Sequence, residues 1–311
     1  MSKQIEYRDF EEKSRNFKEN KKIYSKEDLL EIIENKFANQ YRYFRGVPEA
    51  KYKLYSLGQR YWIENELKCL FTRGYIDFFE TLIKHVRGWN NGTIDKFLEL
   101  QNNKLLNEIA LLSFMQHYGV PTPFVDFTTN AYIALFFAAH YSKITASDNE
   151  FDNYFSLYCV PEQYFCGLEE IKILEKVYAY IKNIESEDIN DYIKNNRATI
   201  RNLASEERLI KIEYIGEKYR LKDVLNDYII NSTRIKNQEG LFVFNPSDEK
   251  SIEEFDTCYN DKFTCYNIHK NLREYILDYL KNEKKITYDY LLPNFDLIGN
   301  YALNEILKLK K

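Results

Sequence analysis

The segment FMQHYGVPTPFVDFTTNAYIALFFA, residues 114–138, joins a helix end, a rigid turn, a short strand and an apolar helix. Gly119 follows a run with helical periodicity, and a helix ends readily at a residue that can adopt a positive φ. Pro121 and Pro123 force extended geometry, because a residue before proline is pushed out of the α region. We therefore predict a helix end at Gly119 and a short buried strand over 124–127.

The residues after this strand predict a helix over Ala131–Tyr141, with Thr128 or Thr129 as its N-cap. This helix is apolar on nearly all sides, so we expect it to be buried. Polar residues nevertheless surround this apolar segment: Gln116, His117, Tyr118, Asp126, Thr128, Thr129 and Asn130. Because buried polar groups need partners, these side chains either hold the segment together or form a binding site.

The composition places the chain in a broad class. It has 311 residues, 44% of them hydrophobic, which is enough for one large domain or two ordinary ones. The formal net charge of −4 gives no overall basic footprint for nucleic acid or a membrane surface. No apolar run approaches the roughly 20 residues of a membrane span, and the polar N-terminus does not resemble a signal peptide. We expect a cytoplasmic protein with reduced thiols and no membrane partner.

The regions on either side of the central segment mix helical and strand patterns. Residues 1–37 predict an N-terminal helical arm, with a capping-box pattern at 25–28. Residues 41–47 alternate as a strand does, and residues 60–89 predict helix with a break at Gly74.

The second half of the chain adds further short strands. They are predicted at 154–160, 228–230, 240–244 and 263–268. Residues 167–211 predict a charged helical insert, and 302–311 predict the end of a C-terminal helix. Together these elements predict an α+β fold, in which short, mostly antiparallel strands form a small sheet surrounded by many helices.

Several common chemistries lack their motifs. The sequence has no Walker loop, dinucleotide-binding glycine fingerprint, His-Glu-x-x-His motif or nucleophile elbow. Four histidines also argue against a multi-histidine metal site, and we predict no metal. Phosphate-loop chemistry and hydrolysis at a serine nucleophile are therefore poorly supported.

Arg45 is the first candidate for ligand binding, in the tripeptide Phe44-Arg45-Gly46. An arginine at the end of a strand presents a fixed fork that binds phosphate in bidentate fashion, and Gly46 lets a ligand approach closely. The alternative is a surface arginine that simply ends a strand.

His117, Gln238 and Glu239 are the other candidates. A histidine at a helix end can donate to a substrate oxygen or cap carbonyl groups. Gln238, two residues before Gly240, can bind a ribose hydroxyl or hold a loop. If this stretch is a strand, Glu239 points to the opposite face from Gln238.

Four motifs together resemble the FRG domain, a domain of bacteria and phages that is named for its Phe-Arg-Gly tripeptide. They are Phe44-Arg45-Gly46, Gln116–Thr122, Asp126–Ala138 and Arg234–Phe242. The resemblance covers roughly residues 38–301. Two positions depart from the pattern, since Pro123 stands where the family usually has arginine and Phe127 where it has tryptophan. If relatives use that arginine to contact a ligand, this chain does without it.

The order of the FRG motifs is in turn similar to that of ADP-ribosyltransferases. That similarity implies an ADP-ribosyltransferase-like core with NAD as substrate. Arg45 would hold the NAD phosphates or the nicotinamide ribose, and His117 would assist. Either Gln238 or Glu239 would hold the ribose while positive charge develops on it. The remaining implied binding residues are Gly46, Tyr118 (stacked on the ring), Asp126, Thr128, Thr129 and Asn130.

Three functions stay open at this stage. The first is an NAD-dependent ADP-ribosyltransferase-like effector or NAD glycohydrolase, of toxin or phage-defence type. It would act on a protein or nucleic-acid acceptor and pair with an antitoxin or defence partner. The second is a non-catalytic nucleotide sensor that signals through the 167–211 insert, and the third is a protein-interaction scaffold. The enzyme needs an acid, Glu239 or Glu206, facing the pocket beside Arg45.

Overall fold

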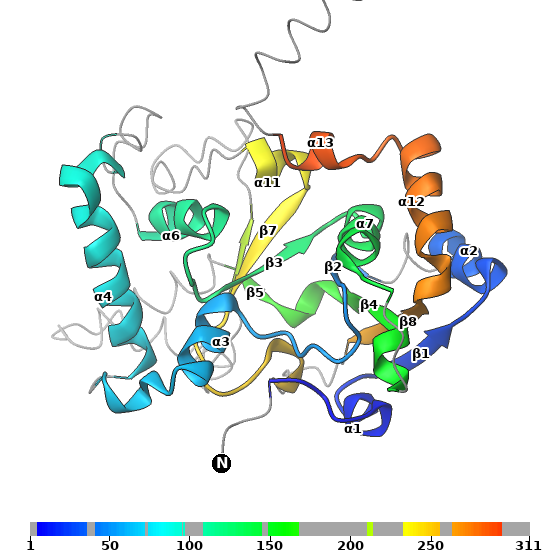
Figure 1. Cartoon of the computed structure of the whole chain (residues 1–311), viewed down its shortest axis with the longest axis horizontal. Coiled ribbons are helices and arrows are strands. Elements are labelled where there is room, and N and C mark those ends of the chain that lie inside the picture. The colour runs from blue at the N-terminus through cyan, green and yellow to red at the C-terminus, as the bar shows by residue number, and fades with distance from the viewer. Residues whose placement is uncertain are drawn as a thin grey trace, which may run out of the picture.

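A computed structural model describes residues 5–35, 41–71, 74–94, 96, 108–144, 149–167, 210–213, 233–255 and 263–293. Within these residues lies an eight-stranded sheet with the order β1-β8-β4-β2-β3-β7-β6-β5 (Figure 1). Its strands are β1 Glu19–Ile23, β2 Tyr43–Val47, β3 Phe124–Thr128, β4 Tyr154–Val160, β5 Cys166–Gly167, β6 Ile210–Glu213, β7 Gly240–Phe244 and β8 Thr264–His269.

The sheet is mixed but mostly antiparallel. Only β1 with β8 and β5 with β6 run parallel among the described strands. The α+β class is therefore confirmed, although the sheet is larger than predicted because short strands extend both of its edges. Residues 1–37, predicted as a helical arm, also supply β1, which lies at one edge. The ends of the predicted insert supply β5 and β6, while residues 168–209 lie outside the described part of the chain.

Helices cover both faces and flank the sheet (Figure 1). The longer ones are α2 Lys26–Asn35, α3 Leu57–Glu64, α4 Tyr75–Gly88, α6 Glu108–His117, α7 Ala131–Tyr141 and α12 Arg273–Asn282. Three shorter ones are α1 Phe10–Ser14, α11 Thr233–Asn237 and α13 Tyr288–Leu291. In Figure 1, α3, α4 and α6 lie beside the β3–β7 part of the sheet, and α2 and α12 beside the β1–β8 part.

Helix α7 is buried against one face of the sheet, as its apolar sequence predicts. Leu135, Ala138 and Ala139 are fully buried, and they share one hydrophobic core with Phe44, Phe155 and other residues of β2, β4 and β8. Burial on nearly all sides explains why the helix carries no polar stripe.

The opposite face is closed by the N-terminal segment. Lys13 of α1 is fully buried there, and its Nζ donates to Ala50 O at 2.7 Å, Ser156 Oγ at 2.8 Å and Asn267 Oδ1 at 2.8 Å. An ammonium group has three donors, so all of its hydrogen-bonding capacity is used. Burial lowers the pKa of Lys13.

The predicted turns and strands around the central segment are confirmed, with one correction. Gly119 and Gly74 adopt φ values of 73° and 77°, and β3 begins at the predicted residue. The N-cap of α7, however, is Asn130, whose Oδ1 accepts from Tyr132 N at 3.0 Å. The prediction of Thr128 or Thr129 as the cap was wrong, because β3 runs through Thr128, and Thr129 still bonds to the turn before β7.

Some predicted elements fall outside the described residues, namely the strand at 228–230 and the C-terminal helix that includes 302–311. Among the described helices, none combines the length and the apolar character that crossing a bilayer requires.

Candidate functional site: a cavity where the sheet divides

The sheet divides between its two central strands. β2 pairs with β4, and β3 pairs with β7, along their full lengths. Between β2 and β3 the ladder has a single pair, Phe44 with Thr128. In a complete antiparallel ladder Gly46 would face Asp126, so beyond Phe44 the edges of the two strands are free to surround a ligand.

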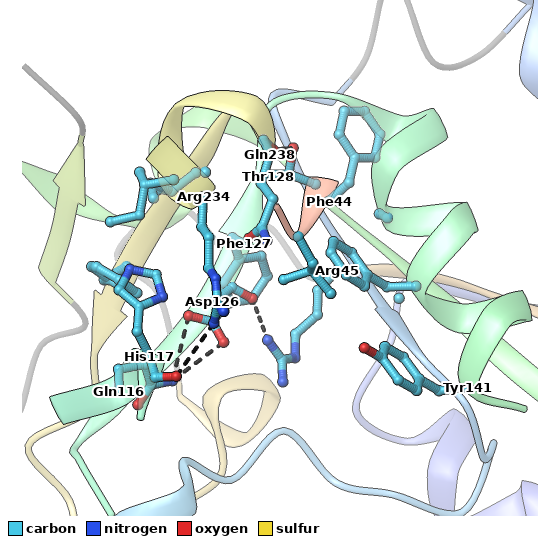
Figure 2. Close-up of a pocket in the computed structure, with 18 of the residues that line it drawn as sticks. Phe44, Arg45, Gln116, His117, Asp126, Phe127, Thr128, Tyr141, Arg234 and Gln238 are labelled. Carbon is cyan, nitrogen blue, oxygen red and sulfur yellow. Dashed lines mark hydrogen bonds between the residues drawn. The ribbon is translucent and has the colours of Figure 1, made fainter. Parts of the chain in front are cut away.

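A cavity of about 390 Å³ lies at this division, on the side of α7 (Figure 2). It is bounded by β2, β3, β7, α6, α7 and α11. Its polar lining residues are Arg45, Gln116, His117, Asp126, Thr128, Tyr141, Arg234 and Gln238. The structure therefore brings together Arg45, Gly46, His117, Asp126, Thr128 and Gln238 of the predicted site.

Arg45 reaches across the division of the sheet. Its Nη1 donates to the backbone oxygen of Asp126, which takes the place of a ladder hydrogen bond between the strands. Its Nε is buried and has no hydrogen-bonding partner among the described residues. Burial lowers the pKa of Arg45, and the nearby charge of Asp126 opposes this shift. A buried donor without a partner is costly unless a ligand or water completes it.

The Asp126 carboxylate faces the cavity from β3. Gln116 Nε2 donates to its two oxygens at 3.2 and 3.4 Å, and Thr122 Oγ1 donates to Gln116 Oε1. Thr122 thus orients the amide of Gln116, which in turn orients the carboxylate. Asp126 is exposed, and it is the one carboxylate among the described residues that line the cavity.

His117 lies at the C-terminal end of α6, as predicted. Its Nε2 is buried and finds no partner in the described part of the chain, and burial lowers the pKa of the ring. Arg234 of α11 donates to the His117 backbone oxygen at 3.4 Å. A positive charge is stabilised there, because the C-terminal end of a helix carries partial negative charge. His117 therefore brings a neutral imidazole to the cavity and also anchors Arg234.

Gln238 is partly engaged by the fold. Its Nε2 donates to Leu291 O at 3.1 Å, and its backbone oxygen accepts from Thr128 Oγ1 at 2.7 Å. The adjacent Asn237 donates to Tyr290 O at 2.7 Å. The end of α11 is thus attached to α13, and Leu292 after α13 lines the cavity.

Four predicted site residues lie outside the lining. Tyr118 is 70% exposed, and its ring packs on Phe114. Thr129, Asn130 and Glu239 form a separate exposed contact: Asn130 Nδ2 donates to Glu239 Oε1 at 2.9 Å, and Thr129 N donates to Glu239 O at 3.0 Å.

The acids that the enzyme interpretation requires are therefore not beside Arg45 in the described structure. Glu239 adopts a positive φ of 45° in the turn before β7, and its carboxylate is held by Asn130. Glu206 lies outside the described residues. Asp126 is left as the lining carboxylate, on the strand next to Arg45.

Gly46 lines the cavity, but its lack of a side chain has another cause. A Cβ atom at this position would lie 1.9 Å from Ala134 O and 2.8 Å from Ala138 N, both in the backbone of α7. The third residue of the Phe-Arg-Gly tripeptide is thus glycine because β2 and α7 pack closely.

Phe137 and Tyr141 of α7 are among the lining residues that were not predicted from the sequence. They follow Ala134 at helical spacing, so all three fall on one face of the helix. The sequence signal was available, but a helix that is apolar nearly all round gives no indication of which face borders a cavity.

The lining favours an anion. It carries the guanidinium groups of Arg45 and Arg234 against the single carboxylate of Asp126. Arg60 of α3 lies close enough for its charge to lower the pKa of Arg45 further. No cluster of three or more metal-ligating side chains occurs in the described ranges.

Comparison with known families gives one match. Residues 40–147 match the family model of the FRG domain, so this part of the chain carries the domain predicted from the tripeptide and the central motif. The match includes β2, β3 and α7, and it ends before Arg234 and Gln238, whereas the sequence resemblance extended to about residue 301. No curated protein and no solved structure matches the chain.

Proposed function

We propose, from the premise that the chain carries an FRG domain, that the cavity between β2 and β3 binds a phosphate-bearing nucleotide and that NAD is its ligand. One observation carries this proposal. Arg45 is held at the division of the sheet with a buried Nε that no described residue partners. Fixed guanidinium groups bind phosphate oxygens in bidentate fashion, so a phosphate would complete this group.

The charge and size of the cavity agree with such a ligand. Arg45 and Arg234 provide an excess of positive charge, and the volume of about 390 Å³ lies near the lower end of the range for ligand pockets. One half of a dinucleotide fits such a volume better than the whole, so the second half of NAD would extend out of the cavity.

Catalysis is a second candidate function, and Asp126 is the observation that favours it. In ADP-ribosyl transfer, the bond between nicotinamide and ribose C1′ breaks, and neutral nicotinamide leaves with the electron pair. A carboxylate beside C1′ stabilises the positive charge left on the sugar. Water or an acceptor group then adds to C1′ and releases a proton, which the neutral imidazole of His117 can accept. Asp126 would take the role that sequence analysis gave to Gln238 or Glu239.

The first experiment titrates NAD into the full chain by calorimetry. Arg45→Ala should weaken binding roughly 10- to 100-fold, the loss typical of hydrogen bonds to a charged group. Arg8→Ala is the matched control, because Arg8 is exposed and pairs with Glu12 in α1. If wild-type protein does not bind NAD, the proposal fails and a scaffold role is left.

The second experiment measures nicotinamide release with and without cell extract. Asp126→Asn keeps the backbone oxygen that holds Arg45 and removes only the negative charge. If Asp126 is catalytic, the Asp126→Asn variant should lose nicotinamide release and keep its affinity for NAD. Binding without any release by the wild-type protein would instead establish a nucleotide sensor. The acceptor, and an antitoxin or defence partner, are proposals that follow from the family resemblance alone.

A further inference from the structure

Two aromatic side chains of α7 form one wall of the cavity. The rings of Phe137 and Tyr141 lie parallel, with an interplanar angle of 1° and centroids 6.3 Å apart. Both line the cavity, and Tyr141 is 47% exposed. A half-exposed aromatic ring on a well-packed helix offers a flat surface at little conformational cost.

Helix α13 lies beside this end of α7. The neighbouring His140 ring packs against Tyr288, with centroids 5.1 Å apart. Burial raises the pKa of Tyr141, and the nearby Tyr288 raises it further. The same helix α13 is attached to α11 through Gln238 and Asn237.

The cavity is therefore divided into two ends. Gln116, His117, Asp126 and Arg234 gather at one end, and Tyr141 lies at the other, with Arg45 between them (Figure 2). The aromatic end is completed by apolar side chains, Phe137 of α7 and Leu292 after α13. A ligand that matches both ends carries a flat, weakly polar ring on one side and an anionic group on the other.

We propose that the Phe137–Tyr141 face is a base-binding subsite, where the heteroaromatic ring of a nucleotide stacks on Tyr141 while its phosphate pairs with Arg45. This inference rests on the proposed nucleotide-binding function and assigns the ring-stacking role to Tyr141 in place of Tyr118. Nicotinamide and adenine both offer an aromatic face, and stacking on protein rings tolerates different bases.

The test compares ligands that share a phosphate but differ in the ring. AMP, nicotinamide mononucleotide and ribose 5-phosphate are titrated into wild-type protein, Tyr141→Ala and Tyr141→Phe. Tyr118→Ala is the matched control, because that exposed tyrosine lies outside the cavity. Far-ultraviolet circular dichroism checks that each variant is folded, which we expect because Tyr141 is half-exposed at the last position of α7.

The expected result is that Tyr141→Ala weakens binding of at least one mononucleotide roughly 5- to 150-fold. Ribose 5-phosphate should bind wild type and Tyr141→Ala equally, and Tyr141→Phe and Tyr118→Ala should keep wild-type affinities. The mononucleotide that is affected identifies which base the subsite takes.

Two results would overturn the inference. If wild-type protein binds mononucleotides and Tyr141→Ala binds them equally well, the subsite is refuted while the proposed function stands. If none of the three ligands binds wild type, the proposed function fails and the subsite fails with it.

Discussion

Lys13 of α1 and Arg45 of β2 are two cationic side chains with buried nitrogen atoms against the same sheet, and they differ in how completely the fold satisfies them. Lys13 uses its three donors on Ala50, Ser156 and Asn267. Arg45 donates to Asp126 O but keeps a buried Nε that has no partner within the described ranges. Burial lowers the pKa of both side chains, so burial alone does not distinguish them.

The difference separates a structural charge from one that is ready for a ligand. A cation whose donors are all used holds elements together, here α1 against β4 and β8. A cation with an unused donor costs free energy in the empty protein and regains it when an acceptor arrives. The variants below test this distinction, in order of decreasing effect.

Lys13→Met should give the largest loss of stability. The substitution keeps an apolar stem but removes three buried hydrogen bonds, although Asn267 Oδ1 still accepts from Ser156 Oγ, and it should lower the free energy of unfolding by about 3 kcal/mol. Urea unfolding measures this loss. Lys21→Met is the control, because the Lys21 side chain of β1 is exposed, and we expect it to change the free energy of unfolding by less than about 0.5 kcal/mol. If Lys13→Met unfolds at the same urea concentration as the wild-type protein, the buried hydrogen bonds of Lys13 contribute nothing to stability.

Gly46→Ala should separate packing from ligand binding beside Arg45. The new methyl group would overlap the α7 backbone at Ala134, so we expect destabilisation of about 2 kcal/mol. Gly88→Ala is the control, since a Cβ there meets no atom within 4 Å and the residue is helical. If thermal unfolding shows both variants to be equally stable, β2 and α7 are not packed as described.

Gln238→Glu tests whether this residue holds α13 or serves as a ribose ligand. Glutamate lacks the amide donor to Leu291 O, so α13 should detach more easily. We expect the free energy of its local opening to fall by about 1 kcal/mol, which raises the rate of hydrogen exchange roughly fivefold. The amides of Leu291 and Leu292, which bond to Thr287 and Tyr288, report this change, and those of α12 serve as an internal control. Unchanged exchange together with altered nucleotide affinity would favour the ligand role.

The smallest effect concerns pH. Burial lowers the pKa of His117 in the folded chain, so below about pH 6.5 the unfolded chain binds more protons than the folded one. Stability should therefore fall as the pH is lowered through this range. Urea unfolding at several pH values gives the dependence of the free energy of unfolding on pH, and His117→Gln should make this dependence weaker. The pH dependence that is left should come partly from His140, because burial also lowers its pKa. An unchanged slope in His117→Gln would contradict a neutral, buried imidazole.

Local structure around the central segment could be predicted from sequence, because the signals there are local. Gly119, the two prolines and the apolar run over 131–141 each act within a few residues, and the structure follows them closely. The strand that contains Arg45 was found in the same way, from alternation that ends at glycine.

The cavity could be predicted only in part. Glu239 is adjacent to Gln238 in sequence, yet a positive φ directs it to Asn130 instead of the cavity. Likewise, the division between β2 and β3 depends on which strands pair along their full length, and pairing across many residues leaves no local signal. Tyr141 was missed for this reason, since α7 borders the cavity only because the sheet divides beneath it.

The most direct test measures both stability and nucleotide binding in Arg45→Met and Lys13→Met. The two variants should have opposite effects. Arg45→Met should lose binding of NAD, while its free energy of unfolding should change by less than about 1 kcal/mol. Lys13→Met should lose stability while the folded protein keeps its affinity. If Arg45→Met is instead as destabilised as Lys13→Met and binds NAD as wild type does, Arg45 is a structural charge and the central claim is contradicted.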